Sequence, residues 1–90
     1  MTANELIEGK GITMTLQEKI DKLPYFVIYQ NVCFELEILF KKEVVWIQYC
    51  VNDNWLFAVE NRNQSMSKIQ RLENVVDQAL TIIKNKEWER

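Results

Sequence analysis

The sequence contains no histidine, one proline, two cysteines and only two glycines, Gly9 and Gly11. Histidine is the commonest general base and metal ligand near neutral pH, so catalysis would have to rest on carboxylate, cysteine, tyrosine or lysine side chains. Two glycines near the N-terminus do not make a glycine-rich phosphate loop or a dinucleotide-binding motif. These absences predict a protein that is not an enzyme and that holds no metal and no cofactor.

The chain also lacks an excess of charge of one sign and lacks long apolar runs. Its 11 basic and 13 acidic residues are mixed along the chain and give a net charge of −2, without the basic stripe typical of nucleic-acid binding. No apolar run approaches the ~20 residues that span a bilayer, and the N-terminal residues have no signal-peptide core. We therefore expect a cytoplasmic protein that binds neither membrane nor nucleic acid, with its cysteines reduced.

Ninety residues, 48% of them apolar and 27% charged, are typical of one globular domain. Residues 1–13 contain few apolar side chains and are interpreted as a flexible N-terminal arm. The codons for Glu8–Gly11 are purine-rich, like a bacterial ribosome-binding site, and Met14 follows at a suitable distance. We therefore hypothesise that Met14 is the natural start and that residues 1–13 are not native. Residues 14–90 are predicted to form a single α+β domain.

Two segments have the pattern of helices. Residues 15–23 begin with a capping box, the Thr-x-x-Glu spacing of Thr15 and Glu18, and end before a proline. Residues 66–88 are amphipathic, and Ser67 with Gln70 makes another capping box. The apolar stripe of this second helix comprises Ile69, Leu72, Val75, Val76, Ala79, Leu80, Ile82 and Ile83.

Four stretches rich in β-branched and aromatic residues lie between these helices and predict strands. They cover residues 25–30, 32–41, 44–51 and 55–61. The fold class is therefore α+β: a short N-terminal helix, a four-stranded antiparallel meander, and a long C-terminal helix packed on one face of the sheet.

The pairing of the second and third strands depends on the turn between them. If Lys41 and Lys42 form a two-residue turn, Cys33 lies opposite Cys50 at a non-hydrogen-bonded position. Opposed Cα atoms there are about 4.5 Å apart, which permits a disulfide. Moving the turn by one residue separates the two cysteines.

Alternation along the strands assigns side chains to two faces. Even-numbered residues from Val32 to Phe40 face the C-terminal helix. The second face carries Cys33, Glu35, Glu37, Leu39, Val44, Trp46, Gln48 and Cys50. On the fourth strand the preceding turn favours Trp55 and Phe57 inside, the alternative being Leu56 and Ala58.

Two interpretations of the second face remain open. Either the helix at 15–23 or curling of the sheet covers it, or it is exposed and binds a partner, because tryptophan is enriched at interfaces. In the second case the sequence predicts a small protein-binding module whose contact residues are Glu35, Glu37, Leu39, Val44, Trp46 and Gln48.

The composition, free of histidine and rich in Lys, Asn and Ile, is typical of a phage or mobile-element product of an AT-rich bacterium. The hypothesis is an inhibitor that occludes a host or defence protein. The alternatives are a single-stranded nucleic-acid binder that stacks bases on sheet aromatics, and a self-associating structural protein such as a homodimer.

Overall fold

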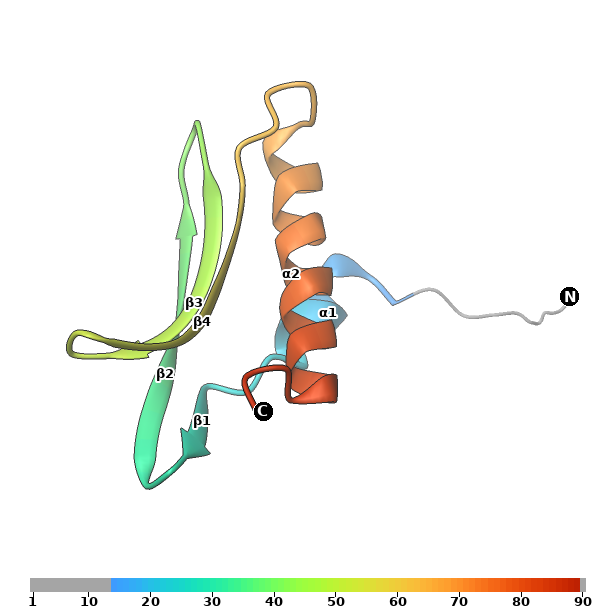
Figure 1. Cartoon of the computed structure of the whole chain (residues 1–90). Coiled ribbons are helices and arrows are strands. Elements are labelled where there is room, and N and C mark those ends of the chain that lie inside the picture. Colours follow the sequence, from blue (N-terminus) through green and yellow to red (C-terminus); the bar gives the residue numbers. More distant parts are fainter. Residues whose placement is uncertain (1–13, 90) are drawn as a thin grey trace, which may run out of the picture.

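The computed structural model describes residues 14–89 and confirms the α+β fold (Figure 1). Two helices and one open antiparallel sheet with strand order β1-β2-β3-β4 make up the domain. The elements are α1 (Leu16–Asp21), β1 (Phe26–Tyr29), β2 (Val32–Phe40), β3 (Val45–Val51), β4 (Asn54–Asn61) and α2 (Lys68–Asn85). The predicted arm at 1–13, including the hypothesis about Met14 as the start, concerns residues outside those described.

Both helices begin at the capping boxes that the sequence predicts. The Thr15 hydroxyl accepts a hydrogen bond from the Glu18 amide at 3.2 Å, and the Glu18 carboxylate accepts one from the Thr15 amide at 2.8 Å. Ser67 and Gln70 make the same reciprocal pair at the start of α2, at 3.1 and 2.9 Å. Each box satisfies amides that the first helical turn leaves without partners.

The hydrophobic core lies between α2 and the inner face of the sheet, as predicted. In Figure 1 the helix runs along one side of the strands, and its contacts are with β3 and β4. Core residues of the sheet and of α2 are buried together: Phe34, Val45, Ile47, Tyr49, Val59, Leu72, Val75, Val76 and Ala79. The predicted apolar stripe of α2 is wrong at its N-terminal end, where Ile69 is exposed and Arg71 is buried.

The loop between β2 and β3 differs from the prediction and changes the register. The Lys41 amide donates to the Val44 carbonyl at 3.0 Å, so Lys42 and Glu43 form the turn, one residue further along than a turn at Lys41 and Lys42. Neither Lys41-Lys42 nor Lys42-Glu43 is of the Asn-Gly type that two-residue hairpin turns favour, so the local sequence does not mark which pair forms the turn. As a result Leu36 pairs with Tyr49, and Cys50 lies opposite Glu35.

This register contradicts the predicted disulfide. Cys33 lies opposite Ile28 of β1 and not opposite Cys50, and both cysteines are free thiols. The possible Cys33–Cys50 disulfide required a turn at Lys41 and Lys42, and the observed register is the one in which a turn shifted by one residue separates the two cysteines.

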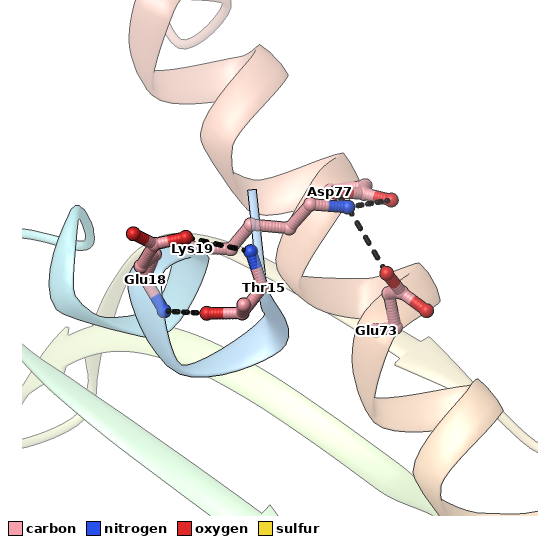
Figure 2. A network of polar contacts seen from close by, with 5 residues as sticks. All are labelled: Thr15, Glu18, Lys19, Glu73 and Asp77. Carbon is pink, nitrogen blue, oxygen red and sulfur yellow. Dashed lines mark hydrogen bonds and ion pairs between the residues drawn. The ribbon is translucent and has the colours of Figure 1, made fainter. Parts of the chain in front are cut away.

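The short helix α1 packs beside α2, on the same side of the sheet (Figure 1). Figure 2 shows the contact: the Lys19 ammonium reaches Glu73 at 3.1 Å and Asp77 at 3.0 Å, both on α2. Hydrogen bonds to Asp77 and Glu73 raise the pKa of Lys19. The interpretation in which this helix covers the second face of the sheet is therefore wrong.

The C-terminus of α2 folds back onto the sheet. Lys86 adopts a left-handed conformation with φ of 48°, and this reverses the chain after the helix. Trp88 then stacks on Phe57, with ring centroids 5.9 Å apart and planes 2° from parallel. Trp88 therefore belongs to the inner side of the sheet.

Candidate partner-binding face

The face of the sheet opposite α2 is called the outer face here. Residues directly opposite one another on antiparallel strands share a face, so the pairing assigns its members. Twelve side chains belong to it: Phe26, Ile28, Cys33, Glu35, Glu37, Leu39, Trp46, Gln48, Cys50, Trp55, Ala58 and Glu60. None of the secondary-structure elements between residues 14 and 89 covers this face (Figure 1).

A groove runs along the outer face from the β2–β3 loop to Trp55. It has a volume of about 390 Å³ and is lined by Glu37, Leu39, Lys41, Val44, Trp46, Gln48 and Trp55. We call it the indole groove. It brings together five of the six predicted contact residues, and the sixth, Glu35, lines a neighbouring hollow with Glu37 and Cys50.

Gln48 forms the floor of the indole groove and fixes two of its walls. Although it lies on the outer face, the residue is only 8% exposed. Its amide nitrogen donates to Glu37 Oε1 at 2.5 Å, and its amide oxygen accepts from Trp55 Nε1 at 2.9 Å. Because the buried amide is hydrogen-bonded on both sides, it holds the Glu37 carboxylate and the Trp55 indole in fixed positions.

Trp55 is a residue that the sequence interpretation placed wrongly. Tyr49 pairs with Phe57 while the next residue, Cys50, pairs with Trp55, so Leu56 is an extra residue in β4. Such a β-bulge reverses the alternation of side chains on the bulged strand. Phe57 faces inward as predicted, but Trp55 faces outward. Three consecutive large apolar residues, Trp55 to Phe57, are the one local sign of the broken alternation.

Trp46 lies half-buried in the groove wall opposite Leu39. Its indole Nε1–H is buried and has no hydrogen-bond partner among the described residues. A buried donor without a partner costs about 1–3 kcal/mol. The side chain therefore contributes apolar surface to the groove while its polar atom does not stabilise the fold.

The charges of the outer face are mainly acidic. Glu35, Glu37 and Glu60 lie on it, and the Cys50 sulfur is 4.0 Å from Glu37 Oε1. Burial, together with the charges of Glu37 and Glu35, raises the pKa of the Cys50 thiol. Because the thiolate is the nucleophile, the raised pKa makes Cys50 less reactive than an ordinary exposed thiol.

Within residues 14–89 no group of three or more potential metal-ligating side chains comes together. No helix in that range has the length and apolar content needed to cross a bilayer. What the outer face offers chemically is apolar contact, hydrogen bonding and negative charge.

Comparisons with protein-family models, with curated proteins and with solved structures return no match to this chain.

Proposed function

We propose that this protein is a non-enzymatic binding module that docks a partner protein through the outer face of its sheet. One observation carries the proposal. Large apolar side chains are exposed on this face, with Phe26 55% exposed, Ile28 66% and Trp55 55%, while both helices pack on the other side of the sheet. Phe26 and Ile28 lie together on β1, and Trp55 lies across Glu35 and Cys50 from Phe26. Exposed apolar surface rimmed by polar residues often marks an interaction site, and tryptophan is prominent in such sites.

Charge selects among the kinds of partner. Glu35, Glu37 and Glu60 give the outer face negative charge around its apolar residues. A second copy docked face to face would bring like charges together, and a nucleic-acid backbone would be repelled. A protein with a basic and apolar surface complements both properties, which favours it over a homodimer or an oligonucleotide.

A module of this kind acts by covering a surface of its partner. Its face is preorganised by the Gln48 hydrogen bonds, so binding costs less ordering of side chains than a mobile surface would require. Inhibition of an enzyme by occlusion is the activity that this mode of binding supports most directly.

The proposal is tested by affinity capture with matched charge-reversed proteins. The Glu37→Lys variant changes the outer face, whereas Glu87→Lys makes the same change beside α2. We expect a partner that the native protein and Glu87→Lys recover equally and that Glu37→Lys recovers at least about tenfold less. If the native protein and both variants recovered the partner equally, or if Glu37→Lys and Glu87→Lys lost it equally, the outer face would not be the docking surface.

Two solution measurements separate the alternatives. Fluorescence anisotropy with single-stranded oligonucleotides at low salt is expected to show no binding; micromolar binding that weakens steeply with salt would replace this proposal with the nucleic-acid reading. Sedimentation is expected to show a monomer, and a dimer dispersed by Glu37→Lys or Ile28→Asp would assign the outer face to self-association.

A further inference from the structure

We infer that the indole groove binds an arginine side chain presented by the partner. This inference rests on the proposed docking through the outer face and specifies the chemistry of the partner at that face.

The groove offers aromatic surface on adjacent strands. Trp46 lies on β3 and Trp55 on β4, and both indoles line the groove with Gln48 as its floor. The hydrogen bond from Trp55 Nε1 to Gln48 holds the second indole in place although the residue is 55% exposed. Arginine stacks on such ring faces, because its guanidinium is planar and weakly hydrated.

A carboxylate in the same groove supplies the opposite charge. Glu37 Oε1 accepts from Gln48, whereas no described residue donates to Oε2. A guanidinium in the groove would give that second oxygen a charge-assisted hydrogen bond while it lies against the indoles. The combination of a flat apolar wall and one oriented carboxylate fits arginine better than lysine, whose ammonium is compact and strongly hydrated.

Lys41 sets the end of the groove at which the cation lies. Lys41 and Glu37 both line the groove. Lys41 lies four residues further along the chain, which corresponds to about 13 Å along an extended strand. Its charge disfavours a second cation at that end. The guanidinium therefore belongs at the Glu37 end.

The inference is tested by NMR titration of the full ¹⁵N-labelled chain with blocked amino acids. The probes are Nα-acetyl-arginine methylamide, its lysine counterpart and its citrulline counterpart, which keeps the shape of arginine but is uncharged. Saturable shifts of the Trp46 and Trp55 indole N–H signals are expected with arginine, at a Kd of about 1–10 mM. The Trp88 indole, stacked on Phe57 on the inner side, is the internal control and should not shift.

Matched variants show which carboxylate acts. Glu37→Gln keeps an oxygen for the Gln48 hydrogen bond but removes the charge, and is expected to weaken arginine binding at least about fivefold. Glu35→Gln removes the same charge from the neighbouring hollow and should change binding less than about twofold. Lys41→Met should strengthen binding by removing a like charge.

The results that overturn the inference differ from those that overturn the docking face. Absence of indole shifts with arginine, equal binding of citrulline, or equal effects of Glu37→Gln and Glu35→Gln would reject arginine recognition. If capture still depended on the outer face, only the inference would fall. If capture did not depend on that face, the proposed function would fall too.

Discussion

The hydroxyl of Tyr49 links β3 to the segment that follows α1. The ring of Tyr49 is fully buried in the core between the sheet and α2, and its hydroxyl donates to the Pro24 carbonyl at 2.7 Å. Burial raises the pKa of the hydroxyl well above its usual value, because the charged form would lose its hydration.

The first prediction concerns this hydroxyl. Tyr49→Phe should lower the free energy of unfolding by about 0.5–1.5 kcal/mol at neutral pH, because the Pro24 carbonyl loses its donor. In the native protein the stability that the Tyr49 hydroxyl contributes is fully present below the ordinary tyrosine pKa of 10.0. It is lost as the pH rises above that value, because the unfolded tyrosine ionises while the folded one stays neutral.

Urea denaturation at several pH values between 7 and 11 measures the effect. The difference in stability between the native protein and Tyr49→Phe should shrink above pH 10. Tyr25→Phe is the control, because that side chain is exposed and should show no such difference. A stability difference between the native protein and Tyr49→Phe that stays constant with pH would contradict the raised pKa of the Tyr49 hydroxyl.

At the scale of elements, α1 is too short to be stable alone and depends on its contact with α2. No residue of α1 itself is fully buried, although Leu16, Ile20 and the following Leu23 contact the core. The Lys19 contacts with Glu73 and Asp77 add to these apolar contacts in positioning the helix (Figure 2).

The second prediction follows from this contact. Lys19→Met keeps an unbranched side chain but removes the ion pairs, and should make amide hydrogen exchange in α1 about two- to fivefold faster. Lys22→Met is the matched control on the exposed side of the same segment. Equal exchange rates in both variants would mean that the ion pairs do not hold α1.

The third prediction concerns the pairing of β2 and β3. Because the register separates Cys33 from Cys50, replacing both cysteines with serine should change the unfolding free energy by less than about 1 kcal/mol. Loss of a native disulfide would cost about 2–5 kcal/mol.

Thiol titration is the direct measurement for this pairing. Both thiols should react without prior reduction, Cys33 faster, because it is exposed while Cys50 is half-buried and has a raised pKa. A native protein that shows no reactive thiol until it is reduced would contradict the register.

For the whole molecule, the decisive property is the difference between the two faces of one sheet. The inner face carries the packing against α2, although Ile38 and Phe40 at one end of it are partly exposed, and the outer face exposes Phe26, Ile28 and Trp55. Stability should therefore depend on the first face, and partner binding on the second.

Matched isoleucines give the fourth prediction. Ile47→Ala, on the inner face and fully buried, should destabilise the protein by about 2–5 kcal/mol. Ile28→Ala, on the outer face and mostly exposed, should change stability by no more than about 0.5 kcal/mol. Thermal or urea unfolding of the two variants checks this, and similar costs at both positions would contradict the division of roles.

The helix starts and the division of β2 and β3 into two faces were determined by the sequence alone. A capping box needs only two side chains three residues apart, as in Thr15 with Glu18, and strand alternation needs only neighbours along the chain. Five of the six residues predicted for partner contact line one groove for this reason.

The tertiary structure decided the β2–β3 register, the outward position of Trp55 and the side on which α1 packs. Pairing Leu36 with Tyr49 or with Ile47 leaves every side chain on the same face, so alternation cannot distinguish the two registers. The loop at Lys41–Val44 makes that choice, and the bulge at Leu56 turns Trp55 outward. Such features depend on contacts between distant segments, which a local pattern of residues does not contain.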